Sequence, residues 1–296
     1  MRIVTDHKLY REWLPSEAGL YLQPEWLDIF NRDWNARIGI SSTGDVLWMW
    51  PYRTSVRYGL TKFGRPVFCP DNAPLEMIRN TLHQFNPEIR RWFSVCEIDD
   101  RTGRMDHEAM INERWKSQER FYQYFDLTSY PYDFSAVSRS KRKRMIKKEH
   151  LEFCLLEDLS DAEELLLQFF HDSGFVHFEF RQLKRIRDQI KHNYDSWILG
   201  IRHPQGYLLA VQWLIGYGDV LYGWVVARNH SQGEKNAREM LVWHILQWAR
   251  DRYKVYDLGG SSIPGVRQFN LEMGAQEKRY WRYQRFYPRW VGQLIP

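Results

Sequence analysis

The stretch from Val255 to Gly274 constrains the fold more than any other part of the chain. A short apolar strand ends in Gly259-Gly260, and a helical pattern over 266–273 stops at Gly274, as helices often stop at a glycine. A strand that passes through a glycine turn into a helix exposes backbone N–H groups, and α/β proteins commonly bind ligands there. A plain tight connection explains the pattern equally well, so both interpretations stay open.

Length and composition indicate a folded protein of more than one domain. The chain has 296 residues, which suits two domains, and its 16% aromatic residues supply a large core. It contains no run of 18 apolar residues and no apolar leader at its N-terminus, so we expect neither a membrane span nor a signal peptide. Cys69, Cys96 and Cys154 are scattered, which is typical of buried thiols. These features predict a cytoplasmic protein.

Basic charge is concentrated in one segment. Without the seven cations between Arg139 and Lys148, the net charge of +5 would be −2. The segment predicts a helix over 134–150 with a weak apolar stripe, and therefore a single anion-facing patch. Arg139 and Arg142 lie three residues apart and can clamp an anion together. Nucleic acid, cofactor phosphates and plain solvent all remain possible partners for this patch.

Apolar periodicity predicts two blocks, 1–128 and 129–296, each a mixed α/β domain with an antiparallel hairpin. A further segment, 53–72, is rich in glycine and proline and is expected to be a loop. Strands are expected at 36–40, 46–52, 93–98, 121–127, 151–156, 197–201, 207–217, 221–227, 254–258 and 279–287. One helix is expected to begin at Pro24, and others to cover 75–85, 160–173, 181–193 and 231 to about 248.

The helix that follows Ser231 offers a possible phosphate site. Ser231 and Glu234 form a capping-box pattern, and the first N–H groups of a helix are free to bind an anion. Gln232 and Gly233 bring the backbone close and Lys235 adds a cation, whereas Glu234 places a carboxylate where the anion would lie.

Other chemistry is not indicated. No HExxH, Cys/His cluster, GxSxG, Walker loop or GxGxxG occurs, so neither a metal site nor a covalent nucleophile is expected. Cations and aromatics alternate from Lys278 to Trp290. That pattern suits stacked bases, but a strand with one buried aromatic face explains it as well and is favoured. His244 lies on an apolar helical face and is interpreted as a core histidine.

Three segments together resemble the FemAB-like group of acyltransferases, which carry two tandem GNAT-like domains. The basic segment from Ser138 resembles the group's R-x-x-I-x-K-A helix, and Tyr256 to Ser261 resembles its D-F-G-G-S element. Val266 to Gly274 resembles G-L-x-x-F-K-x-x-F-G, with Phe269 and Gly274 in place. The order and spacing match over residues 120–290, whereas the N-terminal third matches in a Gln-Pro-x-Trp opening and in architecture. The resemblance implies two domains, each a mixed, mostly antiparallel sheet flanked by helices.

The resemblance implies an N-acyltransferase that moves an acyl group from acyl-CoA, as co-substrate, to a small-molecule or peptide amine in a ternary complex. Oxyanion N–H groups would come from strand 221–227, Asp257 would be the general base, and Tyr280 would donate a proton to the leaving thiolate. The remaining residues implied are Gln232, Gly233, Lys235 and Asn236 for the cofactor, and Arg139, Arg142, Ser261, Arg267, Phe269 and Asn270 for the substrate.

Two alternatives remain. Fem-type enzymes transfer an amino acid from aminoacyl-tRNA to a peptidoglycan precursor, and the 139–148 helix would then bind tRNA. The lysine that the resemblance expects after Phe269 is Asn270 here, and the chain has no room for the coiled-coil arm of some members, so both departures count against that activity. The other alternative is a non-catalytic GNAT-fold binding protein, which a filled splay between the strands ending at Ala227 and Leu258 would favour.

Overall fold

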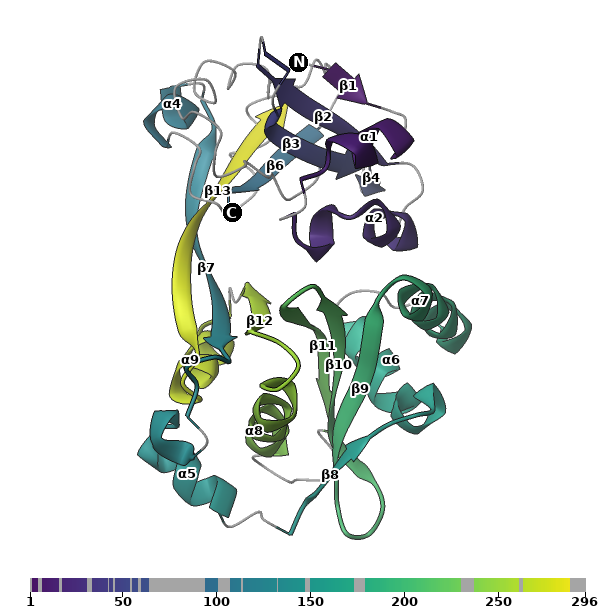
Figure 1. Ribbon diagram of the computed structural model, residues 1–296, viewed down its shortest axis with the longest axis vertical. Helices are drawn as coiled ribbons and strands as arrows, with labels where there is room; N and C mark the ends of the chain where they lie inside the picture. The colour runs from purple at the N-terminus through teal and green to yellow at the C-terminus, as the bar shows by residue number, and fades with distance from the viewer. Residues whose placement is uncertain are drawn as a thin grey trace. The chain divides into compact units, whose positions relative to one another are not determined.

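The chain forms two compact units (Figure 1), which we call unit 1, residues Met1–Arg120 with Arg279–Pro296, and unit 2, residues Phe121–Lys278. This computed structural model describes residues 2–4, 7–15, 18–30, 34–41, 43–44, 46–53, 55–57, 60–63, 94–100, 107–112, 114–131, 133–146, 150–172, 179–229, 237–260 and 263–287. The helix expected at 75–85 lies outside them. Among these residues, no helix is both long enough and apolar enough to span a membrane.

Unit 1 contains a three-stranded antiparallel sheet in the order β1-β2-β3. The strands are β1 (Arg2–Val4), β2 (Trp34–Ile40) and β3 (Val46–Arg53), and the helices beside them are α1 (His7–Trp13), η1 (Leu20–Leu22) and α2 (Pro24–Phe30). Trp34, Ala36 and Ile38 alternate into a core with Tyr10, whose ring meets that of Trp34 edge to face at 4.9 Å. The expected hairpin and the helix beginning at Pro24 are confirmed.

A second group of strands in unit 1 follows the order β4-β5-β6-β13. They are β4 (Ser55–Arg57), β5 (Leu60–Phe63), β6 (Ser94–Asp100) and β13 (Gln276–Tyr287), and α4 (His107–Asn112) belongs to the same unit. β5 and β6 are parallel, and β6 and β13 are antiparallel. The expectation of a loop over 53–72 is wrong for β4 and β5. These strands are only three and four residues long, which is too short to show an alternation of apolar and polar residues. Pairing with a neighbouring strand stabilises them instead.

Unit 2 is built on strands in the order β7-β12-β11-β10-β9-β8. They are β7 (Lys116–Asp126), β8 (Glu152–Leu155), β9 (Asp195–Arg202), β10 (Leu208–Tyr217), β11 (Val220–Arg228) and β12 (Val255–Gly260). The β11–β12 pair is parallel, and the pairs on either side of it are antiparallel. Every strand expected in this part of the sequence is confirmed.

Helices cover both faces of this sheet, with α8 on one face and α6 and α7 on the other (Figure 1). Unit 2 contains η3 (Phe134–Ala136), α5 (Arg139–Ile146), η4 (Leu159–Ala162), α6 (Glu163–Asp172), α7 (Phe180–Asn193), α8 (Ala237–Ala249) and α9 (Pro264–Glu272). α8 packs into the main core, but the expected single apolar stripe is wrong. Val242, Trp243 and Leu246 are buried as well as Met240, Leu241 and Ile245, so nearly every side of the helix is covered. The basic helix is shorter than expected and begins at Arg139. The expected start at Ser160 is also corrected, because the Asp158 carboxylate accepts a hydrogen bond from Ser160 N.

Each unit is closed by a strand that spans a boundary between the units in sequence. β7 follows the unit 1 elements in sequence but pairs with β12 of unit 2, in the register Tyr256 to Phe125. β13 follows unit 2 in sequence but pairs with β6 of unit 1, in the register Trp281 to Asp100. In both units the closing strand lies beside one member of a parallel pair. The units divide at Arg120 and Lys278, whereas the predicted boundary lies at residue 128 and the predicted second domain includes 279–287.

Candidate functional site

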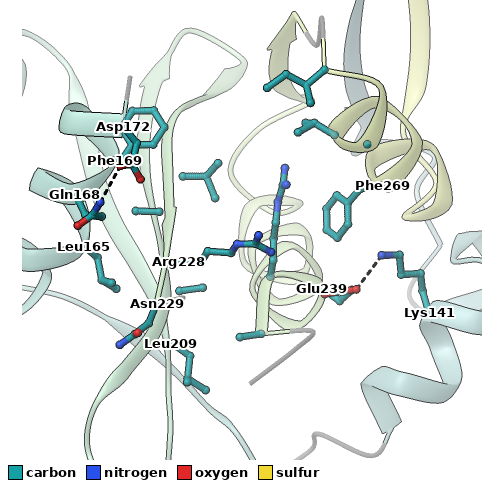
Figure 2. A pocket seen from close by; sticks show the side chains of 18 residues that line it. Lys141, Leu165, Gln168, Phe169, Asp172, Leu209, Arg228, Asn229, Glu239 and Phe269 are labelled. Atoms are coloured by element: carbon teal, nitrogen blue, oxygen red, sulfur yellow. Dashed lines mark hydrogen bonds and ion pairs between the residues drawn. The ribbon is translucent and has the colours of Figure 1, made fainter. Parts of the chain in front are cut away.

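A cleft opens in unit 2 where the parallel strands β11 and β12 stop pairing. The two strands are in register over Val220–Tyr222 and Val255–Asp257, after which β11 continues to Arg228 and β12 leads into α9. The cavity has a volume of about 690 Å³ and lies between the end of β11 and α9 (Figure 2). Its lining residues are Lys141, Leu165, Gln168, Phe169, Asp172, Leu209, Ala210, Val226, Ala227, Arg228, Asn229, Ala237, Arg238, Glu239, Ile263, Gly265, Val266 and Phe269. Ligands bind α/β sheets in this place, beyond the carboxyl ends of the strands.

A β-bulge in β11 explains why the strand turns away from its partner. Trp213 pairs with Val225 and Leu214 pairs with Gly223, so Trp224 is an extra residue on β11. Its ring packs on Trp213 at 4.8 Å between centroids. A bulge bends its strand and increases the local twist. The bend lies just before Val226, the first residue of β11 that lines the cleft, and within the segment expected to hold the oxyanion donors.

One wall of the cleft contains a buried ion pair. Lys141 Nζ of α5 lies 2.8 Å from Glu239 Oε1 of α8 (Figure 2) and 3.6 Å from Glu272 Oε2 of α9. Lys141 and Glu239 are only 7% and 6% exposed. The same ammonium lies 4.4 Å above the centre of the Phe269 ring. Because buried charges are costly unless paired, this cluster ties α5, α8 and α9 together.

Arg238 also lies against the Phe269 ring but makes no ion pair among the described residues. Its Cζ is 4.2 Å from the ring centre, and its Nε is buried without a hydrogen-bond partner in that part of the chain. Burial lowers the pKa of Arg238; the nearby Tyr256 opposes this, and the positive charge of Arg228 adds to it. The Arg228 side chain extends into the same cavity (Figure 2).

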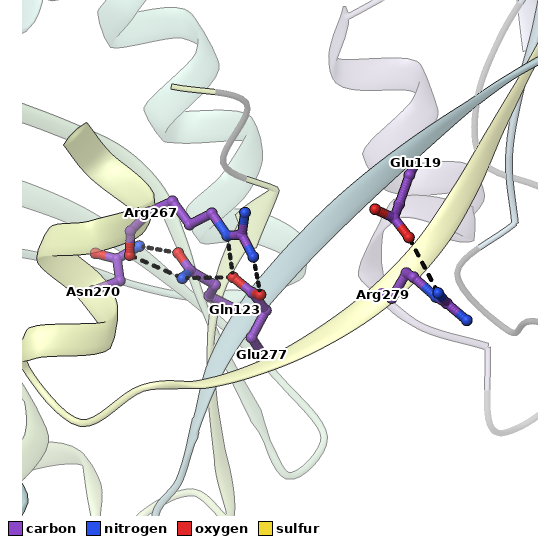
Figure 3. A network of polar contacts seen from close by, with 6 residues as sticks. All are labelled: Glu119, Gln123, Arg267, Asn270, Glu277 and Arg279. Carbon is purple, nitrogen blue, oxygen red and sulfur yellow. Dashed lines mark hydrogen bonds and ion pairs between the residues drawn. The ribbon is translucent and has the colours of Figure 1, made fainter. Parts of the chain in front are cut away.

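Two of the expected substrate-binding residues form a polar network instead of lining the cleft (Figure 3). Asn270 is 4% exposed and donates from Nδ2 to Gln123 Oε1 at 2.8 Å. Gln123 Nε2 in turn donates to the carbonyl oxygen of Arg267 at 3.0 Å. The Arg267 guanidinium forms a two-point pair with Glu277, at 2.7 Å and 2.6 Å, and lies 3.7 Å from the centre of the Phe121 ring. The network fastens α9 to β7 and to the start of β13.

Asp257, the expected general base, shapes the glycine turn. Its Oδ1 accepts a hydrogen bond from Gly259 N at 2.6 Å. Gly259 has a φ of +73°, which a side chain would strain. Asp257 is partly buried and is not among the residues that line the cleft.

The other expected site residues fall in different places. Phe269 lines the cleft, whereas Arg139 is exposed on α5 and Arg142 donates to the carbonyl oxygen of Val137 at 3.3 Å. Tyr280 is buried in unit 1. The remaining expected residues, Gln232, Gly233, Lys235, Asn236 and Ser261, lie outside the described residues.

Sequence reasoning missed Lys141, Arg238 and Glu239 as cleft residues. Lys141 was one of seven neighbouring cations, and a charge run does not show which member faces inward. Arg238 and Glu239 stand at the start of an otherwise apolar helical stretch, and that contrast was the available signal. Within the described ranges, no group of three or more His, Cys, Asp or Glu side chains is placed to hold a metal ion.

Comparison with known proteins gives the fold. No protein-family model and no curated protein matches the sequence. Among solved structures, the crystal structure of FemX superposes over 100% of both chains with a TM-score of 0.69 at 13% identity. The chain has the FemX-like fold. At a sequence identity this low, structural similarity shows a shared fold and nothing about activity.

Two further solved structures place this FemX-like chain among the GNAT folds. A GCN5-related N-acetyltransferase from Sphaerobacter thermophilus matches with a TM-score of 0.56 and 10% identity, covering 94% of this chain and 84% of that one. A tandem GNAT protein from the clavulanic acid biosynthesis pathway matches with a TM-score of 0.51 and 9% identity, covering 86% and 82%. The expected class, two tandem GNAT-like domains with mostly antiparallel sheets flanked by helices, is confirmed.

Proposed function

We propose that this protein is an N-acyltransferase that moves an acyl group from a thioester, acyl-CoA, to an amine in the cleft of unit 2. The observation that carries the proposal is the open cavity of about 690 Å³ at the carboxyl ends of the separating parallel strands β11 and β12. A cavity of this size holds most of a ligand as large as the acyl end of a cofactor. The FemX-like fold and the likeness to an N-acetyltransferase support the same class of reaction.

In this proposal the protein acts mainly by positioning the reactants. The amine nitrogen attacks the thioester carbonyl carbon, the C–S bond breaks, and the leaving thiolate takes up the proton that the nitrogen loses on becoming an amide. Apolar residues such as Val226, Ala227 and Val266 hold the acyl arm, and backbone N–H groups of the bulged β11 stabilise the oxyanion. Asp257 stays our proposed acceptor of the ammonium proton, because it lies on β12 at the last register position before the strands separate.

Two elements of the sequence-based expectation are not carried forward. Tyr280 belongs to unit 1 and is not a lining residue of the cleft, so the proposal gives it no role. No observation favours tRNA as the donor: in α5, Lys141 faces the cleft wall and is already paired with carboxylates. The cytoplasmic location remains a proposal.

Binding of CoA tests the proposed function. Isothermal titration of the whole chain with CoA and acetyl-CoA is expected to give dissociation constants of about 1–100 μM. Val226→Trp fills the cleft and should weaken binding by about tenfold or more, because the side chain occupies the site of the ligand. Val220→Trp, on the same strand but outside the cleft, is the matched control and should leave binding unchanged. The proposal fails if neither ligand gives heat above that of buffer at about 1 mM.

A further inference from the structure

The charged side chains that line the cleft differ in whether the structure describes a partner of opposite charge for them. Lys141 is paired with Glu239 at 2.8 Å and has Glu272 at 3.6 Å, so its charge is already balanced. Arg238 has no such partner within the described residues and meets the Phe269 ring instead. Glu239, its neighbour in sequence, is directed to Lys141 (Figure 2). The cleft therefore contains a partly buried guanidinium that makes no ion pair with a described residue.

A partly buried guanidinium is stabilised when an anion pairs with it. An aromatic face compensates a cation in part, but the ring leaves the edge of the guanidinium free to donate hydrogen bonds. The buried Nε of Arg238 makes no hydrogen bond to another described residue, and a buried donor without a partner is costly. A planar anion that accepts two parallel hydrogen bonds suits this group best.

The net charge of the lining indicates a monoanion. Among the lining residues that the structure describes, the charged ones are three cations, Lys141, Arg228 and Arg238, and two carboxylates, Asp172 and Glu239, which leaves a net charge of +1. A carboxylate carries one negative charge, whereas a phosphate monoester carries about −1.5 to −2 near neutral pH. The apolar walls around Leu209, Val226 and Ile263 also favour an ion that is more weakly hydrated than a phosphate dianion.

We propose that Arg238, held against Phe269, binds a carboxylate of the substrate, so that the protein acts on a carboxylate-bearing compound. This inference rests on the proposed acyl transfer, because it assigns the substrate class of the same cleft. The carboxylate comes either from the amine acceptor, as in an amino acid or the C-terminus of a peptide, or from the acyl group, as in a dicarboxylic acyl thioester. Arg238 is a binding residue in this scheme and takes no part in proton transfer.

Paired probes that differ in one carboxylate test this inference on the whole chain. In the acceptor arm, L-alanine and L-alanyl-L-alanine are titrated against their C-terminal amides, with and without CoA. In the donor arm, succinyl-CoA is titrated against butyryl-CoA. We expect the carboxylate member of at least one arm to bind about tenfold more tightly than its partner, which is the scale of one charge-assisted hydrogen bond. The arm that shows the preference identifies the source of the carboxylate.

Variants attribute the preference to Arg238. Arg238→Gln should bring the ratio of the affinities for the carboxylate probe and its uncharged partner to about one. Arg238→Lys keeps the positive charge but loses the paired N–H donors of the guanidinium, so it should keep part of the preference. Arg252→Gln is the matched control, because Arg252 also lies over an aromatic ring, Trp248 at 4.8 Å, outside the cleft. Thermal unfolding of each variant verifies that it is folded.

The outcomes separate this inference from the proposed function. A carboxylate preference that is lost in Arg238→Gln supports the inference, even if CoA itself does not bind. Equal binding of both members in both arms, no binding of any carboxylate probe, or a preference that survives in Arg238→Gln overturns it, even if CoA binds.

Discussion

At the scale of single residues, the cleft depends on one aromatic ring that meets two cations. Phe269 has the Lys141 ammonium at 4.4 Å and the Arg238 carbon at 4.2 Å from its centre. The two cations differ in their partners, since Lys141 is paired with carboxylates whereas Arg238 makes no ion pair with a described residue. The ring therefore holds one structural cation and one cation that we propose is used for binding.

Removing the structural cation should destabilise the protein. Lys141→Met leaves the Glu239 carboxylate buried and unpaired, so we expect the free energy of unfolding to fall by about 3–5 kcal/mol. Urea denaturation followed by tryptophan fluorescence measures the change. Lys254→Met is the control, because it breaks a pair of similar length, 2.7 Å to Asp219, that is exposed on both sides. That variant should differ little from the parent, and equal losses in the two variants would refute the assignment.

The pKa of His244 predicts a loss of stability on mild acidification. Burial lowers this pKa, and the ring stacks on Phe153 at 5.0 Å between centroids. A lowered pKa means that the unfolded chain takes up the proton first. The contribution of His244 is therefore fully present above its unfolded pKa of about 6.5 and decreases as the pH falls below that value.

The test compares the free energies of unfolding of the parent and of His244→Gln between about pH 7.5 and pH 5.5, above the range in which carboxylates protonate. The parent should lose more stability than the variant over this range. Parallel pH profiles would show that His244 is not the titrating group.

At the scale of elements, the glycine turn after α9 fixes where this helix ends and how closely it approaches its neighbours. Gly274 has a φ of +92°, and a Cβ built there would lie 2.9 Å from the carbonyl oxygen of Ala136 and 3.2 Å from the Tyr130 ring. The glycine that the sequence predicted as the helix stop is thus needed for two reasons, its backbone conformation and the close approach of the segment before α5.

A pair of glycine substitutions separates these two reasons. Gly206 has a nearly equal φ of +95°, and no atom lies within 4 Å of the position that a Cβ would take there. Gly206→Ala therefore measures strain alone, about 1 kcal/mol of unfolding free energy. Gly274→Ala adds the steric clash and should cost about 2–4 kcal/mol. Equal costs in urea denaturation would mean that the Ala136 contact contributes nothing.

At the scale of the whole molecule, unit 1 is completed by a strand from the far end of the chain, since β13 pairs with β6. Deleting residues 279–296 removes the part of β13 that pairs with β6 in unit 1. We expect amides of Ser94–Asp100 to exchange hydrogen faster in that variant, as measured by mass spectrometry, because they lose their partners. Amides of β12, which pair with β7 and β11 within unit 2, should change little.

A shorter truncation is the control for this experiment. Ending the chain after Tyr287 keeps all of β13 and should leave exchange in β6 as in the full chain. Unchanged exchange in β6 after the longer deletion would contradict the pairing.

Hydrophobic periodicity and turn residues were sufficient to predict most strands and helices of unit 2 and its fold class. The β10–β11 hairpin and the strand–glycine–helix stretch both depend on residues close in sequence, and the structure contains both. Phe269 is the one residue of the sequence-based site that lines the cleft among those the structure describes. The short strands β4 and β5 were missed, because their order comes from pairing with other strands.

The sequence by itself determined most of the elements of unit 2, since hydrophobic periodicity and glycine stops act between near neighbours. Tertiary structure decided the rest, because charges and amides take their roles from partners far along the chain. Lys141 meets Glu239 across 98 residues, and Asn270 meets Gln123 across 147. A basic run cannot show that one of its lysines is balanced within the wall of the cleft. A motif cannot show that the position where a lysine was expected holds a buried amide that fastens α9 to β7.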